Sequence, residues 1–378
     1  MNILIISYIY PSPEDPRIGI FIHEQAKELV KQGHKVQVIT SNGNNRDKVE
    51  KIDNITIYRL NCHKHFKGLF FNFKLLNKII KLKGKIDIIH IHFIGSNALF
   101  CWLGSKFLHI PLLATTHGID VCSKNFLHNL LIKFYLSFPK KIMAVSNYTA
   151  DLAKVNTNRN KVYVVNNGVD VEKLRVTKDK FKLKRDLGLD NSLILLSVGA
   201  LVERKGIDLI IKVLPQVIKD VLNLTYLIIG KGEQESYLKN LVKSLNLQDH
   251  VRFLGFVSSK ELANYYNLCD IFVLMSKTIK EKGGVEGFGI VYIEASYLGK
   301  PVIGGKSGGT GDAIIDKVTG YRIDPNNLQD LTKKLVLLLK NKNLRDKMGK
   351  EGQKFVKNNL LWKHNAEKTL KIYKEAIN

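Results

Sequence analysis

Short apolar runs alternate with longer amphipathic segments along most of the sequence, and this rhythm limits the possible folds more than any other feature. Runs rich in β-branched residues, such as 2–7, 35–40 and 193–198, predict buried strands. Segments with helical periodicity, such as 21–32 and 207–220, separate such strands. Strands interleaved with helices form parallel sheets with right-handed crossovers. The sequence therefore predicts an α/β fold.

A chain of 378 residues is too long for one ordinary core, so we expect two domains. The turn-forming run 166–170 and the charged segment after it separate two halves with the same rhythm. We place one domain at residues 1–170 and the other at 171–354. A helical tail at about 355–378 is expected to cross back to the first domain. Ligands of parallel α/β sheets bind beyond the carboxyl ends of the strands.

The charge of the chain points to an anionic partner. The formal net charge is +25, and residues 51–141 alone carry 14 Lys or Arg against 3 Asp or Glu. In that region four lysines face away from the apolar side of a predicted helix, after several phenylalanines: Lys74, Lys78, Lys81 and Lys85. Peripheral contact with an anionic membrane and a plain solvated helix face both explain the pattern. Nucleic acid is a weaker candidate, because no recognisable binding module accompanies the charge.

Cysteine spacing and the N-terminus are typical of a cytoplasmic protein. The four cysteines show no paired or metal-like spacing. Residues 1–7 have no basic lead and are too short for a signal peptide, so we interpret them as a first strand. The most apolar window, 98–113, is interrupted by Lys106, His109 and Pro111, and we expect no membrane span.

The strongest functional signal is the stretch 283–294, which reads GGVEGFGIVYIE. A buried strand is expected at 271–275 before it, and a helix is expected directly after its glycines, ending at Gly299. Strand, glycine-rich turn and helix direct free backbone N–H groups at an anion. Eight helical residues would separate Glu286 from Glu294 by about 12 Å, which suits two ends of a long ligand such as a diphosphate with a sugar on each side. The plain alternative is a glycine turn that caps an ordinary helix.

Taken in order, six landmarks make the chain similar to a known family. They are residues 21–38, 117–118, 167–170, 199–206, 230–232 and 286–294. The chain resembles the retaining, nucleotide-sugar-dependent glycosyltransferases of family four, whose GT-B fold has two Rossmann-like domains facing across a cleft. The resemblance implies an N-terminal acceptor domain and a C-terminal nucleotide-sugar donor domain. Residues 277–294 are most similar to the mannosyltransferase branch that modifies lipid-linked acceptors.

The resemblance also implies roles for individual residues. Glu294 is expected to hold the ribose hydroxyls, and Glu286 and His117 are the candidate catalytic residues near the donor sugar. Gly19 would let the backbone approach the diphosphate, although a plain turn glycine explains it too. The family often has Arg after the first glycine of the second domain; Ala200 stands there, and Arg204 is expected to supply the charge. The full donor-binding set is Gly19, Arg204, Lys205, Lys231, Val257, Gly287, Phe288, Gly289, Ile290 and Glu294.

The expected chemistry needs no metal. The sequence has no Asp-x-Asp, the usual metal-holding motif of glycosyltransferases with other folds. Charge that develops on the leaving diphosphate could be stabilised by Arg204, Lys205 and the amides of residues 287–290. No residue is recognisable as a carboxylate nucleophile, so retention of configuration is implied by the family alone.

We therefore expect a metal-independent hexosyltransferase with no cofactor, whose donor is a GDP- or UDP-linked sugar, with mannose the favoured hexose. The acceptor would be lipid-linked or a polysaccharide, in cell-surface glycan synthesis at the inner face of the membrane. Two alternatives stay open. A nucleotide-sugar epimerase would need a proton-transferring set that the sequence does not show, and a non-catalytic nucleotide-sugar-binding protein would follow if Ala200 disabled turnover.

Overall fold

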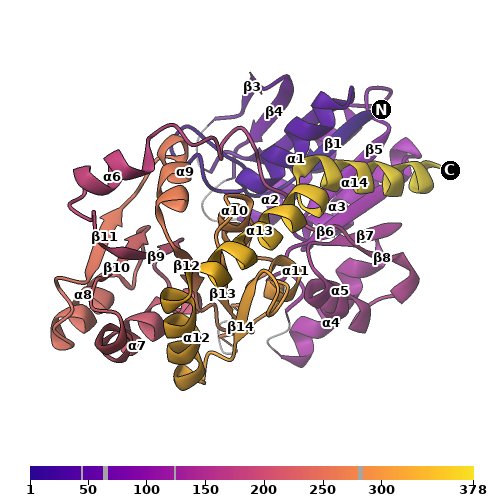
Figure 1. Cartoon of the computed structure of the whole chain (residues 1–378). Coiled ribbons are helices and arrows are strands. Elements are labelled where there is room, and N and C mark those ends of the chain that lie inside the picture. Colours follow the sequence, from indigo (N-terminus) through magenta and orange to yellow (C-terminus); the bar gives the residue numbers. More distant parts are fainter. Residues whose placement is uncertain (44–45, 63–66, 123–124, 280–283) are drawn as a thin grey trace. The chain divides into compact units, whose positions relative to one another are not determined.

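The chain folds into two compact units, shown in Figure 1. The computed structural model describes residues 1–43, 46–62, 67–122, 125–279 and 284–378. The N-terminal unit comprises Met1–Asn167 together with Trp362–Asn378, and the C-terminal unit comprises Gly168–Leu361. The chain thus returns to the first unit at residue 362 rather than at about 355, because helix α13 (Lys342–Asn359) packs within the C-terminal unit.

The N-terminal unit is built on one sheet in the order β3-β4-β2-β1-β5-β6-β7-β8. All neighbours are parallel except β3 and β4, an antiparallel hairpin that the sequence analysis missed. Asp53 and Asn54 make its turn with positive φ angles of 50° and 61°, a conformation that Asn and Asp tolerate. The strands are β1 (Asn2–Ile6), β2 (Lys35–Ser41), β3 (Lys48–Ile52), β4 (Ile55–Leu60), β5 (Ile88–His92), β6 (Leu112–Thr116), β7 (Lys141–Ala144) and β8 (Val162–Val164).

Helices cover both faces of this sheet, because side chains alternate between the faces along each strand. Ile3 and Ile5 of β1 pack with α1 and α14, and Figure 1 shows these two helices, indigo and yellow, side by side. Leu4 and Ile6 point into the core formed with α2, α3, α4 and α5. The helices are α1 (Ile20–Lys31), α2 (Lys67–Ile80), α3 (Asn97–Leu108), α4 (Phe126–Ser137), α5 (Asn147–Val155), the 3-10 turn η1 (Arg159–Lys161) and α14 (Trp362–Ile377).

The C-terminal unit has a wholly parallel sheet in the order β11-β10-β9-β12-β13-β14. Its strands are β9 (Leu193–Val198), β10 (Leu224–Ile229), β11 (Val251–Gly255), β12 (Ile271–Leu274), β13 (Val302–Gly305) and β14 (Gly320–Ile323). The other elements are α6 (Lys180–Asp186), η2 (Glu203–Lys205), α7 (Ile207–Asp220), α8 (Glu235–Ser244), α9 (Ser259–Leu268), α10 (Ile290–Tyr297), α11 (Thr310–Ala313), α12 (Leu328–Lys340) and α13.

The carboxyl ends of β9, β10, β12 and β13 lie along one edge of this sheet, since these strands are parallel neighbours. Glycines follow them where backbones approach one another. A side chain at Gly230 would collide with the carbonyl oxygen of Gly199, and one at Gly206 with that of Met275. The sheet register therefore brings the glycine loops of the sequence analysis to one edge.

Candidate active site

Glu286 gathers two cations at this edge. Arg204 Nη1 lies 2.8 Å and Lys205 Nζ 2.7 Å from Glu286 Oε2, and Ser276 Oγ donates to the same oxygen at 3.0 Å. Arg204 and Lys205 come from the turn η2 after β9, and Ser276 follows β12. Glu286 is only 8% exposed. Burial raises the pKa of its carboxyl group, but Lys205 and Arg204 outweigh burial and lower the pKa to about 2.

The helix begins directly after the glycine turn, as expected from the sequence. Helix α10 starts at Ile290, and its N-cap Gly289 has a left-handed φ of 94°, so Glu286 precedes the helix. The rise along an eight-residue helix therefore does not describe the separation of Glu286 and Glu294. Backbone bonds fix the turn instead, since Gly309 N donates to Glu286 O at 2.8 Å. Phe288 is 2% exposed, which leaves only its main chain available to a ligand.

Glu294 lies on α10 and has a different environment. It is half-buried, and the hydroxyl of fully buried Tyr266 donates to its Oε2 at 2.7 Å. Burial raises the pKa of the Glu294 carboxyl group, and the Tyr266 hydrogen bond and the charge of Lys173 offset part of the rise. The two carboxylates of the motif thus have separate partners and opposite pKa shifts.

Lys231 and Val257, two residues of the expected donor-binding set, come together at the ends of β10 and β11. Gly230 N donates to Gly255 O at 2.8 Å, which places Lys231 beside the residues after β11. Lys231 is exposed, Phe256 is half-exposed, and Val257 is partly buried. Ala200 is exposed on the loop after β9.

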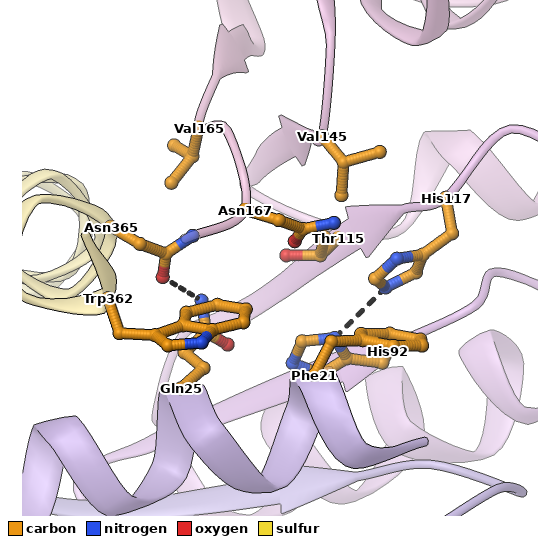
Figure 2. Close-up of a pocket in the computed structure, with 10 residues that line it drawn as sticks. All are labelled: Phe21, Gln25, His92, Thr115, His117, Val145, Val165, Asn167, Trp362 and Asn365. Atoms are coloured by element: carbon orange, nitrogen blue, oxygen red, sulfur yellow. Dashed lines mark hydrogen bonds between the residues drawn. The ribbon is translucent and has the colours of Figure 1, made fainter. Parts of the chain in front are cut away.

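The N-terminal unit holds His117 directly after β6. Its Nε2 lies 3.1 Å from Nδ1 of His92, as Figure 2 shows, and its ring stacks on Phe93 with centroids 4.3 Å apart. Burial lowers the pKa of both imidazoles, that of His92 to about 3. Asp120 holds the loop, because its carboxylate accepts from the backbone N–H groups of His117, Gly118 and Ile94 at 2.8–3.0 Å. Burial raises the pKa of Asp120 to about 6.

A small cavity lies under these histidines (Figure 2). Its volume of about 10 Å³ is room for about one water molecule. Two atoms that line it, Gln25 Oε1 and His92 Nε2, are buried and make no hydrogen bond within the described residues. Gln25 is oriented by donation from its Nε2 to Asn365 Oδ1 at 2.7 Å, which leaves its oxygen as an acceptor.

Gly19 is the N-cap of α1 and has a left-handed φ of 69°. A Cβ there would lie 2.7 Å from the carbonyl oxygen of Ile9, so local packing by itself requires glycine. Gly19 and His117 belong to the N-terminal unit, and Arg204, Lys205, Glu286 and Glu294 belong to the C-terminal unit.

Sequence reasoning missed the residues that support the site. Tyr292 lies inside the stretch 283–294 but carries no signal apart from its neighbours, and Ser276 and Tyr266 belong to no motif. His92 contacts His117 from the neighbouring strand, and Asp120 reaches Ile94 after that same strand. In the region 51–141, the described Phe71 is fully buried, whereas Phe70 and Phe73 are half-exposed. Helix α2 ends at Ile80, so Lys81 and Lys85 lie beyond it; Phe66 falls outside the described residues.

Among the described residues, no group of three or more His, Cys, Asp or Glu side chains could hold a metal ion. Across the same residues, every helix is too short or too polar to cross a membrane.

Two units, each with a largely parallel sheet and crossover helices, make up the GT-B fold, and solved GT-B structures superpose on almost the whole chain. The family model described as "Glycosyl transferases group 1" matches residues 179–355, and "Glycosyltransferase Family 4" matches residues 18–173. The chain belongs to this glycosyltransferase family, which confirms the family predicted from the sequence.

Individual relatives agree with this assignment. An uncharacterized glycosyltransferase of Haemophilus influenzae is 30% identical over 327 residues, covering 84% of this chain and 85% of that protein. A GDP-mannose-dependent monoacylated alpha-(1-6)-phosphatidylinositol monomannoside mannosyltransferase of Corynebacterium glutamicum is 34% identical over 211 residues, 54% of each chain. The structure of HepE from Anabaena in complex with UDP has a TM-score of 0.80 at 18% identity, covering 99% of this chain and 100% of that one.

Proposed function

We propose that this glycosyltransferase moves a hexose, with mannose the first candidate, from a nucleotide-diphosphate sugar to a lipid-linked or polysaccharide acceptor in cell-surface glycan synthesis, with retention of configuration. The observation that carries the proposal is the pairing of Arg204 and Lys205 with Glu286 at the N-terminal end of α10. Two cations and the N-terminus of a helix suit a diphosphate. Mannose and a lipid acceptor are suggested by the activity for which the Corynebacterium relative is named, and HepE with UDP keeps a uridine donor open.

Breaking the bond from the anomeric carbon to the diphosphate leaves negative charge on the phosphate oxygen. Lys205, Arg204 and the amides at the start of α10 would stabilise that charge without a metal. The acceptor oxygen would attack from the same face and pass its proton to the leaving phosphate oxygen, so that no protein nucleophile is needed. Glu286 stays ionised, so its role would be to orient the cations and the sugar hydroxyls. Glu294 would accept from the ribose hydroxyls.

His117 and Gly19 are assigned to the donor by the family resemblance alone. For Arg204, the ion pair with Glu286 supports the expectation that it supplies the charge missing at Ala200.

Membrane association is part of the proposal, and helix α4 supports it better than α2 does. Five large apolar side chains on α4 are 49–80% exposed: Phe126, Leu127, Leu130, Leu131 and Phe134. Exposed Lys133 lies on the same helix. Exposed apolar side chains with basic neighbours suit the surface of an anionic bilayer.

Label transfer tests the proposal. Labelled GDP-mannose and UDP-sugars are incubated with the protein and a lipid extract, and label is measured in the organic phase with release of nucleoside diphosphate. We expect transfer in the presence of a chelator, and a loss of at least about 100-fold in Lys205→Ala. Lys239→Ala is the matched control, because this lysine pairs with Glu235 on the surface of α8. Tight nucleotide binding without turnover would support the binding-protein alternative, and interconverted donor sugar without transfer would support an epimerase.

A further inference from the structure

Two buried tyrosines stand behind the two carboxylates of the donor site. Tyr266, on α9, donates its hydroxyl proton to Glu294 Oε2 at 2.7 Å. Tyr292, on α10, shares its one hydroxyl proton between the carbonyl oxygen of Leu274 at 2.6 Å and Ser276 Oγ at 3.1 Å. Ser276 in turn donates to Glu286 Oε2. Each carboxylate of the motif is therefore supported by a different tyrosine, one directly and one through a serine.

The same two tyrosines flank one core residue. The ring centroid of Phe272, on β12, lies 5.7 Å from that of Tyr266 and 5.8 Å from that of Tyr292. All three side chains are fully buried. Aromatic contacts of this kind hold rings in fixed positions, and a buried tyrosine has few rotamers to lose. The row Tyr266–Phe272–Tyr292 thus forms a rigid support under both carboxylates.

Two glycines make room for the row at Tyr292. A Cβ at Gly289 would lie 2.5 Å from Cδ2 of Tyr292, and one at Gly304 would lie 3.2 Å from its Cε1. Gly289 is therefore needed both to leave space for the Tyr292 ring and to adopt the left-handed turn. The glycine motif and the tyrosine form one packed unit.

Both supported carboxylates keep one oxygen available. Among the described residues, the hydrogen bonds to Glu286 and to Glu294 all end on Oε2, and none reaches Oε1. A carboxylate with one oxygen fixed presents the other in a defined direction. For Glu294 that oxygen could accept from a ribose hydroxyl, and for Glu286 from a hydroxyl of the donor sugar.

We infer that Tyr266 and Tyr292 are positioning residues with different roles. Tyr266 orients Glu294 and so determines how strongly the site prefers a donor with ribose hydroxyls. Tyr292 orients Glu286 through Ser276 and so determines the rate of transfer. This inference rests on the proposed function, which assigns Glu294 to the ribose and Glu286 to the donor sugar. Neither tyrosine is proposed to touch the donor. Loss of either hydroxyl should leave the fold in place, because Phe fills the same volume.

The role of Tyr266 is tested by measuring how tightly the full chain binds a nucleoside diphosphate and its 2′,3′-dideoxy form. We expect the wild type to prefer the ribose form by at least about tenfold, since hydrogen bonds to a charged group are strong. Tyr266→Phe should reduce that preference at least about threefold, and Tyr292→Phe should leave it unchanged. In a Glu294→Gln background, Tyr266→Phe should have no further effect on the preference.

The role of Tyr292 is tested by the kinetics of sugar transfer. Tyr292→Phe should lower kcat at least about tenfold while the preference for ribose persists, and Tyr266→Phe should act mainly on KM for the donor. Tyr226→Phe is the matched control, since Tyr226 is also fully buried and, among the described residues, its hydroxyl bonds Ser197 Oγ alone, at 2.7 Å. It should change neither quantity.

The possible outcomes distinguish a failure of the proposed function from a failure of the inference about the tyrosines. A wild type that binds both nucleotides equally would overturn the assignment of Glu294 in the proposed function. A wild type that discriminates, with a Tyr266→Phe variant that discriminates equally well, would overturn the inference alone. The inference would also be overturned if Tyr226→Phe lowered the preference for ribose or lowered kcat, because a general loosening of the core would then explain both effects.

Discussion

Glu286 shows at the residue scale how neighbours decide what a carboxylate can do. Its burial alone would raise the pKa, yet Lys205 and Arg204 lower it to about 2 from an ordinary value of 4.5. It is therefore ionised at any pH at which the protein would work and cannot serve as a proton donor. Glu294, with no cation paired to it in the described residues, has its pKa shifted upward instead.

The ion pairs of Glu286 should make the free energy of unfolding depend on pH. Because the folded pKa lies below the unfolded value, the ionised carboxylate stabilises the fold fully above about pH 4.5, and this contribution is lost as the pH falls toward 2. The contribution is on the order of 3 kcal/mol. Urea denaturation between about pH 3 and pH 6 should give a steeper loss of unfolding free energy in the wild type than in Glu286→Gln. Equal slopes would show that the cluster does not hold Glu286 ionised.

At the scale of the element, helix α10 offers a comparison between its two ends. Gly289 and Gly299 both have left-handed φ angles, 94° and 73°, but only at Gly289 would a Cβ meet a side chain closely. Gly299→Ala should cost about 1–2 kcal/mol, the strain of the backbone alone. Gly289→Ala should cost more than Gly299→Ala and also lower transfer activity, because Tyr292 must move. Similar unfolding free energies for the two variants would contradict the tight seating of Tyr292.

Helix α4 allows a test of membrane association at the same scale. Leu130→Asp places a charge on its exposed apolar face, so binding to vesicles that contain anionic lipid should fall about tenfold. The melting temperature should hardly change, since Leu130 is 56% exposed. Leu222→Asp, at a position 78% exposed in the C-terminal unit, is the control for adding charge. Equal vesicle binding by both variants and the wild type would remove α4 from the proposal.

For the whole molecule, the return of the chain at Trp362 makes the N-terminal unit depend on the last residues. Helix α14 fills one of its two cores with Ala366, Leu370 and Tyr373, and Tyr373 hydroxyl lies 2.6 Å from Nδ1 of buried His90. Ending the chain at Leu361 should therefore destabilise the N-terminal unit by several kcal/mol. Calorimetry should show its transition shifted further than that of the C-terminal unit. Equal shifts would contradict this division of the chain.

Much of the donor site could be predicted from the sequence because its signals are local. Gly289 caps the helix that carries Glu294, and the two residues are close along the chain. Gly283, the first residue of the stretch, falls outside the described residues. Arg204 and Lys205 follow strand β9, and the carboxyl ends of neighbouring strands in a parallel sheet lie along one edge. The place of this basic pair at that edge could therefore be predicted. The estimate of the Glu286–Glu294 separation from eight helical residues does not apply, because Glu286 lies on the turn before the helix.

The sequence by itself determined the alternation of strands and helices, the two-domain organisation expected of 378 residues and the family, since all three depend on periodicity and on short ordered motifs. Only the tertiary structure decided which side chains support those motifs. Tyr266 reaches Glu294 across 28 residues, Gln25 reaches Asn365 across 340, and Arg204 reaches Glu286 across 82. The physical reason is that pKa shifts and carboxylate orientation arise from burial and from neighbours brought close by packing, which spacing along one chain does not encode.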